Sequence, residues 1–243
     1  MATHKDFDAP DADIAFVSSD GVTFKLHKKH LDTTAGAFPP SEFHTTDEVV
    51  PLAEPSATLE IVFKFLYPSR YPELEESMPF ELFADVAEAA EKYQVFLAIA
   101  ASKSLMRRVE YTCDRRCLAS NNHTHNLLRK TLPSHADKIA LHALKHGRKD
   151  ILDWAAIPLL CYPFEKTIDM LPDHVVRPWA IYYFRCSELR NKIIIDYRSD
   201  AAPIKKLRSD LSRVFATDES WNSRAYKEDV KHIGNFSDYL SLT

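Results

Sequence analysis

The stretch DIAFVSSDGVTFKLHKKHL, residues 13–31, decides the fold of this 243-residue chain. Apolar residues recur at every second position on both sides of the dipeptide Asp20-Gly21. An Asp-Gly pair between two such runs predicts a β-hairpin, because glycine accepts the positive φ that a tight turn requires. After Leu26 the alternation stops, and we expect a short helix over residues 28–36.

Outside this stretch the pattern changes from strand to helix. Residues 48–52, EVVPL, predict a short strand that ends or lies at a sheet edge, because Pro51 cannot donate to a ladder. Apolar residues with helical spacing then predict helices over 55–67, 79–93 and 95–111, and further helices over 135–147, 149–160, 163–171 and 174–197. Gly147 suits the C-cap of one of them. The sequence therefore predicts an α+β fold followed by an all-helical part.

Composition limits the function classes. The chain is 45% hydrophobic and 27% charged, typical of a soluble globular protein. The polar start, MATHKDFDAPDAD, predicts no secretory signal, and no run of 18 apolar residues predicts a membrane span. Four sparse cysteines favour a reducing compartment, the cytoplasm or the nucleus. The four glycines are scattered, which argues against a glycine-rich phosphate-binding loop and therefore against the commonest nucleotide-binding enzymes.

Charge is distributed unevenly along the chain. Residues 1–100 carry 7 Lys/Arg against 18 Asp/Glu, a net charge of −11, whereas residues 101–200 carry 17 against 11, a net charge of +6. This asymmetry indicates two modules. The basic segment 101–150, with 11 Lys/Arg against 4 acids, leaves open a transcription-associated or nucleic-acid-binding role, although a solvated helical surface explains it better and nucleic acid is disfavoured as a partner.

Two patterns that contain histidine are candidates for metal or catalytic sites. Cys113, Cys117, His123 and His125 form C-x3-C-x5-H-x-H, which supplies four zinc-type ligands at a spacing that matches no common finger. His142 and His146 are four residues apart but lack the glutamate of an H-E-x-x-H site. We expect no metal site in either pattern. With no nucleophile motif in the chain, we also expect no catalytic residue and no cofactor, and a small unrecognised enzyme is the weaker alternative.

Three sequence segments, in this order along the chain, resemble the BTB/POZ domain. They are DIAFV…GVTFKLHKKHL at 13–31, IVFKFLY at 61–67 and AAEKYQV at 89–95. In that family an Asp opens the first hairpin strand, a His follows the second strand and a Leu comes four residues later; Asp13, His27 and Leu31 take those places. The family's A-x-K-Y-x-V text is taken here by Ala90, Lys92, Tyr93 and Val95. The resemblance implies a small sheet with a cluster of helices.

The later text ALHALKHGRKDILDWAA and RPWAIYYFRCSELRNKI is similar to the helical extension of BTB proteins in mushroom-type fungi. We therefore divide the chain into a polar N-terminal tail at 1–12, a BTB/POZ-like domain at 13–111 and a helical extension at 112–243. Residues 199–243 are expected to add a helix or two. The family's extra strand before the Asp is not evident in residues 1–12, which argues against a strand-swapped dimer.

The resemblance also implies a function. BTB proteins self-associate and dock partner proteins, among them cullin-type ubiquitin-ligase scaffolds and transcriptional corepressors. The family's dimer face includes the first helix after the His, here around 28–36. The residues that the resemblance assigns to partner or dimer contacts are Asp13, His27, Lys28, Leu31, Phe38 and Glu42. We interpret His27 as a hydrogen-bonded structural residue and Lys28 to His30 as the exposed side of the helix. Pro39-Pro40 departs from the family's usual text after this helix.

Overall fold

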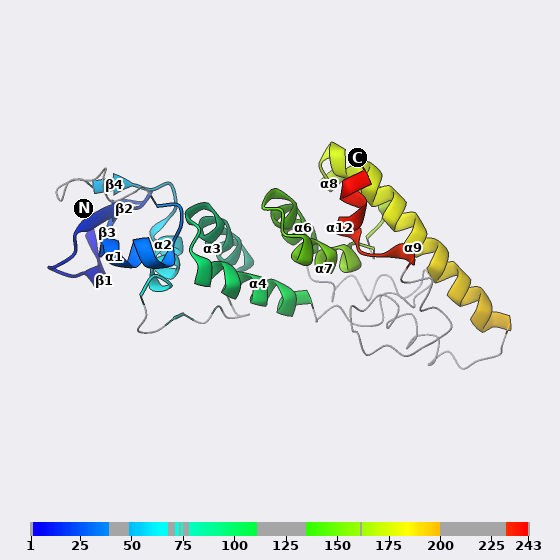
Figure 1. Ribbon diagram of the computed structural model, residues 1–243, viewed down its shortest axis with the longest axis horizontal. Coiled ribbons are helices and arrows are strands. Elements are labelled where there is room, and N and C mark those ends of the chain that lie inside the picture. The colour runs from blue at the N-terminus through cyan, green and yellow to red at the C-terminus, as the bar shows by residue number, and fades with distance from the viewer. Residues whose placement is uncertain are drawn as a thin grey trace. The chain divides into compact units, whose positions relative to one another are not determined.

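The computed structural model describes residues 2–38, 49–67, 71–72, 74, 78–110, 135–160, 162–199 and 232–242. These residues belong to two compact units, Met1–Leu105 and Met106–Thr243. The division falls inside helix α4, Phe96–Glu110, somewhat before the predicted boundary at 111. The first unit combines a sheet with helices and the second is helical, which confirms the predicted α+β class (Figure 1).

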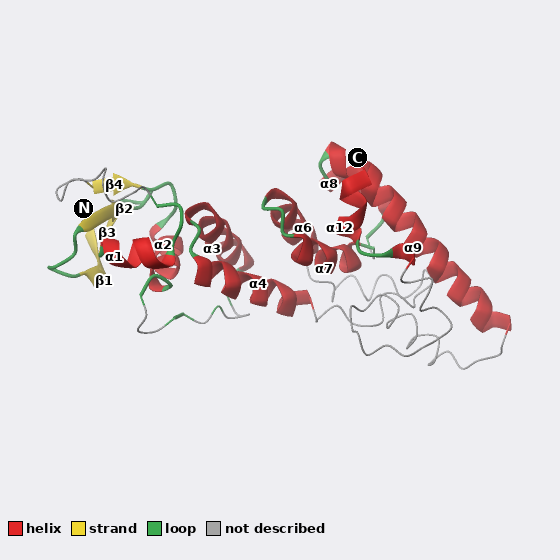
Figure 2. Cartoon of the chain, viewed as in Figure 1, coloured by secondary structure: helices red, strands yellow, loops and turns green. Residues whose placement is uncertain are grey.

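The sheet has four strands in the order β1-β3-β2-β4 (Figure 2). The strands are β1 Ala2–Asp8, β2 Ile14–Val17, β3 Val22–Leu26 and β4 Val49–Pro51. β2 and β3 form the predicted antiparallel hairpin, with Phe16 opposite Phe24 and Gly21 at a φ of 83°. β1 pairs with β3 and β4 pairs with β2, both in parallel, so the sheet is mixed.

Strand β1 corrects the expectation that residues 1–12 form a polar tail without a strand. Its register against β3 shifts between Thr3 and Asp8, which brings the side chains of His4 and Phe7 onto Phe24, at ring-centroid distances of 4.9 and 5.6 Å. A regular strand would point residues 4 and 7 to opposite faces. The irregularity removes the alternation by which a strand is recognised in sequence, and Phe7 is the one buried residue of β1.

In the described part of the chain, the first unit is completed by α1 Lys28–Thr34, α2 Ser56–Lys64, α3 Phe80–Tyr93 and the first part of α4. Its core contains a cluster of aromatic rings, in which Phe63 of α2 lies 5.7 and 5.2 Å, between ring centroids, from Phe16 and Phe24 of the hairpin. Neither His27 nor Pro55, the N-cap residues of α1 and α2, supplies a side-chain cap. Aspartates of the hairpin supply it instead, since carboxylate oxygens satisfy the free N–H groups at a helix start.

The second unit contains α6 Ala136–Lys145, α7 Lys149–Leu159, α8 Phe164–Met170, α9 Asp173–Ser199, α12 Phe236–Tyr239 and the 3-10 turn η3 Leu240–Leu242. Gly147 has a φ of 62° and ends α6 as predicted: the Arg148 N–H donates to the Ala143 carbonyl, as in a Schellman cap. Trp179 of α9 is completely buried, and its Nε1 donates to Thr167 of α8 at 2.9 Å. Among the described residues, no helix combines the length and apolarity that a membrane span requires.

Candidate protein-interaction site

The predicted site residues Asp13 and Lys28 meet where β3 passes into α1. The backbone N–H of Lys28, the first residue of α1, donates to Asp13 Oδ1 at 2.7 Å. The Asp13 N–H in turn donates to the Leu26 carbonyl at 3.1 Å. Asp13 therefore joins the first strand of the hairpin to the start of α1 and acts as its N-cap from fifteen residues away. This hydrogen bond brings two of the predicted site residues together through the Lys28 backbone N–H.

His27 is held by a residue that the sequence analysis did not single out, Tyr67. The Tyr67 hydroxyl lies 3.2 Å from the His27 backbone nitrogen and 3.1 Å from its ring Nδ1. Because the Tyr67 hydroxyl oxygen accepts the His27 backbone N–H, the hydroxyl's own proton can be donated to Nδ1. We therefore assign Nδ1 as the acceptor and place the proton of the imidazole ring on Nε2. His27 is thus the hydrogen-bonded structural residue that the sequence predicted.

The chain of Asp11, His27 and Tyr67 resembles a proton relay, but its electrostatics do not suit catalysis. Nε2 of His27 lies 3.4 Å from Asp11, whose side chain is 79% exposed. Burial raises the pKa of Tyr67, against the lowering effect of the hydrogen bond from His27. A nucleophilic or basic tyrosine needs the opposite shift. The pKa of Asp11 is lowered by backbone hydrogen bonding and then by His27, so the carboxylate stays ionised beside the imidazole.

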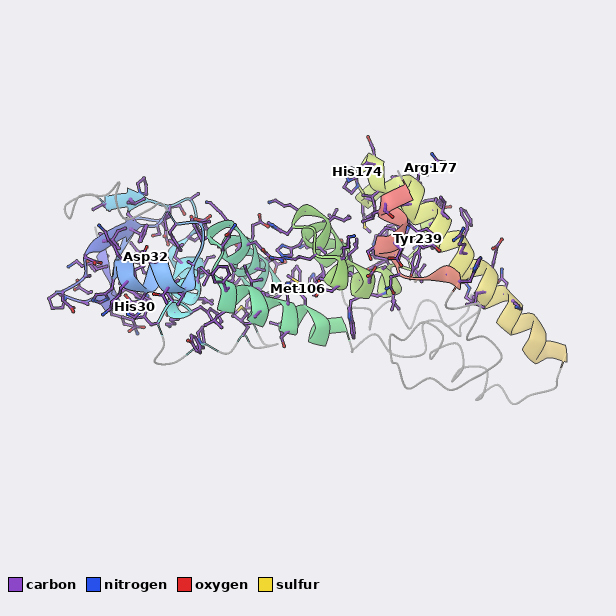
Figure 3. All side chains as sticks on the ribbon, viewed as in Figure 1. His30, Asp32, Met106, His174, Arg177 and Tyr239 are labelled. Atoms are coloured by element: carbon purple, nitrogen blue, oxygen red, sulfur yellow. The ribbon has the colours of Figure 1, made fainter. Side chains whose placement is uncertain are left out.

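The remaining predicted site residues are Leu31, Phe38 and Glu42. Leu31 is buried, as expected of the inward side of α1. Of the side predicted to be exposed, Lys29 is exposed, whereas Lys28 and His30 are half-buried; Asp32 is also exposed (Figure 3, where His30 and Asp32 are labelled). Phe38 stacks on Tyr93 at a ring-centroid distance of 4.7 Å, so its ring contributes to packing within the unit. Glu42 and Pro39-Pro40 lie outside the described residues.

The A-x-K-Y-x-V text has a structural explanation. Lys92 and Tyr93 both donate to the carboxylate of Glu54, and the distance from Lys92 Nζ to Glu54 Oε1 is 2.6 Å. The Tyr93 ring also packs against Phe38. Burial, followed by the bond to Glu54, raises the pKa of Tyr93 to about 12. Gln94 then takes a left-handed φ of 52° to end α3. This motif therefore fixes the end of α3. Its partner Glu54 could not be identified from the sequence.

One exposed apolar surface lies directly after α1, and we call it the Phe96 face: Gly36, Ala37, Phe96 and Leu97. Phe96 and Leu97, the first residues of α4, are 56% and 41% exposed. Gly36 and Ala37 are also exposed, and their N–H groups donate to the carbonyls of Gln94 and Tyr93. A Cβ on Gly36 would lie 3.3 Å from the tip of the Phe96 ring. Exposed aromatic residues beside small ones are typical of protein contacts.

The two Cys/His patterns, in which we expect no metal site, are placed only in part. Cys113, Cys117, His123 and His125 lie outside the described residues, as does the part of the basic segment around them, residues 111–134. The expectation that they bind no zinc and the nucleic-acid alternative therefore stay predictions. His142 and His146 lie together on α6 and its C-cap, with ring centroids 4.6 Å apart.

Comparison with known proteins finds no match: no protein-family model matches the chain, and no curated protein sequence matches it.

Proposed function

We propose that the chain is a non-catalytic protein–protein interaction protein of the BTB/POZ type, with an interaction module in its first unit and a helical extension in its second. The observation that carries the proposal is the Phe96 face next to the end of α1. The sequence resemblance assigns partner contacts to α1, and the end of this helix leads to Gly36 beside Phe96, the most exposed large hydrophobic residue in the described part of the first unit. Asp13, His27 and Tyr67 support the proposal because they fix α1 on the hairpin.

The partner that we propose first is a second copy of the chain. The resemblance implies a dimer face around α1, and Phe96 supplies an aromatic side chain of the kind that dominates such contacts. The exposed residues of α1 itself, Lys29, Asp32 and Thr33, are polar. A contact with an aromatic centre and a polar rim suits a weak association that salt weakens further.

Sedimentation velocity over a concentration range tests this proposal on the full chain. We expect the sedimentation coefficient to rise with concentration, with half-association at roughly tens of micromolar, and the rise to shrink in about 0.5 M salt. A constant, monomeric value up to about 100 μM contradicts self-association.

A separate pull-down asks whether the partner is a cullin-type scaffold instead. If a purified cullin N-terminal region binds the monomer, the proposed interaction function stands, but the partner is the cullin and not a second copy of the chain. Absence of both self-association and cullin binding at about tens of micromolar would contradict the proposal for these partners.

A further inference from the structure

A short C-terminal segment, residues 232–242, packs on α7 and α9 of the second unit (Figure 3, where Tyr239 is labelled). Phe236 and Tyr239, at the two ends of α12, are 1% and 2% exposed. Phe236 meets Trp179 edge to face at a ring-centroid distance of 5.1 Å, and Tyr239 meets Tyr182 in the same way at 5.5 Å. Two aromatic side chains three residues apart therefore supply the apolar part of the contact.

The polar part of the contact is equally specific. Asp153 of α7 accepts the Ser237 N–H on Oδ1 at 2.7 Å and the Ser237 hydroxyl on Oδ2 at 2.8 Å. Arg185 of α9 donates to the Tyr239 hydroxyl at 3.1 Å. We call Asp153, Trp179, Tyr182 and Arg185 the α7–α9 surface. This surface contacts one helical turn of the C-terminal segment through the segment's two aromatic rings, its serine and its tyrosine hydroxyl.

The segment carries its own folding information. Asn235 and Asp238 form a reciprocal capping box, in which the Asn235 N–H donates to Asp238 Oδ2 at 3.0 Å. A capping box satisfies donors at the start of a helix and so favours the turn before any docking. The contacts made by Phe236, Ser237 and Tyr239 thus come from one capped turn of four residues, a unit that a segment of another protein can present as well.

We propose that the α7–α9 surface is a peptide-binding site, and that the chain's own C-terminal segment is its intramolecular occupant. The external partner is a protein segment that forms a helical turn with aromatic residues at its first and fourth positions and a serine at its second. The seated segment itself defines this chemistry, since its Phe236, Ser237 and Tyr239 meet those requirements. This inference rests on the proposed function in partner binding, but it involves neither Phe96 nor α1.

The full chain with Ser237→Glu tests the proposal. A glutamate at this position sets a second carboxylate against Asp153, and like charges in a half-buried place repel, so the segment should leave its site. Ser241→Glu is the matched control, because Ser241 is exposed and its hydroxyl bonds only locally, to the Asp238 carbonyl. Hydrogen exchange followed by mass spectrometry should show lost protection at 232–242 in Ser237→Glu and unchanged protection in Ser241→Glu.

The vacated surface is then titrated with a fluorescein-labelled peptide of sequence HIGNFSDYLSLT, and anisotropy is measured. We expect binding to Ser237→Glu at least about tenfold tighter than to the wild type or Ser241→Glu, because a tethered segment competes at an effective concentration of about millimolar. The same peptide with alanine for its phenylalanine should not bind. Equal binding to all three chains, or none to a Ser237→Glu chain that has released its segment, overturns the proposal.

A further variant, Phe236→Ala/Tyr239→Ala, covers the case in which Ser237→Glu does not release the segment. If neither variant releases residues 232–242 without unfolding the second unit, the segment is an integral part of the fold and the proposal is wrong. Because none of these measurements uses the Phe96 face, their failure is distinguishable from a failure of the proposed function.

Discussion

The two units contain the same pair of residues in the same hydrogen-bonding arrangement, in different surroundings. Asp20 accepts the N–H and the hydroxyl of Ser56 at 2.9 and 2.6 Å, and Asp153 accepts those of Ser237 at 2.7 and 2.8 Å. Each aspartate serves the start of a helix. Asp20 is exposed, and bonds from Ser18 and then Ser56 lower its pKa to about 2. Asp153 is half-buried, and burial raises its pKa.

This difference shows that the surroundings decide what an identical contact does. In the exposed pair, water competes for both partners, and the bond serves mainly to orient α2 beside the hairpin turn. In the half-buried pair the carboxylate has lost water, so that breaking the bond leaves polar groups unsatisfied. The docking of the C-terminal segment should therefore depend on Asp153 far more than the position of α2 depends on Asp20.

The largest expected effect follows directly. Asp153→Ala removes both acceptors of Ser237 from a half-buried place, and we expect the free energy of local opening at 232–242 to fall by about 2 kcal/mol. Hydrogen exchange of that segment measures the loss. Asp20→Ala is the counterpart in the first unit, and its effect on exchange in α2 should be clearly smaller. Equal effects would remove the distinction between the two pairs.

The cap of α1 offers an intermediate case. Asp13→Ala deletes the acceptor of the Lys28 N–H, and we expect the free energy of unfolding of the first unit to fall by about 1 kcal/mol in chemical denaturation. Asp11→Ala removes a neighbouring but exposed carboxylate and should leave it nearly unchanged. A larger effect from Asp11 than from Asp13 would mean that the ion pair with His27, and not the cap, fixes α1.

Both units also end a helix with a left-handed residue, Gly147 in the second and Gln94 in the first. Gly147→Ala should cost about 1 kcal/mol, because an L side chain is strained at a φ of 62° although nothing crowds it. Gln94→Gly relieves the same strain and should stabilise the first unit by about 0.5 kcal/mol. Thermal or chemical unfolding of the two variants tests the opposite signs.

The smallest expected effect is a pH dependence of opposite sign in the two aspartate pairs. Because the folded pKa of Asp20 lies below 3.8, its contribution to stability is present above about pH 4 and is lost as the pH falls towards 2. The raised pKa of Asp153 means that its contribution is fully present below about pH 4 and is lost as the pH rises through that raised value.

Exchange of α2 and of 232–242, corrected for intrinsic rates and measured against pH, should show the two trends. Asp20→Asn and Asp153→Asn should each flatten their own curve. Curves that change in the same direction in both units would contradict the assigned causes of the pKa shifts.

The sequence predicted what depends on neighbouring residues. The Asp20-Gly21 hairpin, the cap at Gly147 and the bounds of the main helices follow from local turn chemistry and periodicity. It did not predict strand β1, because a register shift hides its alternation.

The partners that fix the candidate sites were also missed, because each comes from a distant part of the chain. Tyr67 is 40 residues from His27, Glu54 is 39 from Tyr93, and Ser237 is 84 from Asp153. Phe96 was visible only as one apolar residue of a helix, since exposure follows from tertiary packing.

The central claim, that the Phe96 face binds protein, is tested most directly by a matched pair of variants. Phe96 and Phe184, a residue of α9, are 56% and 54% exposed, so Phe96→Glu and Phe184→Glu make the same change at equal exposure in the two units. Sedimentation velocity should show association of the wild type and of Phe184→Glu, and a dissociation constant at least about tenfold weaker for Phe96→Glu. Association of Phe96→Glu equal to the wild type would contradict the claim.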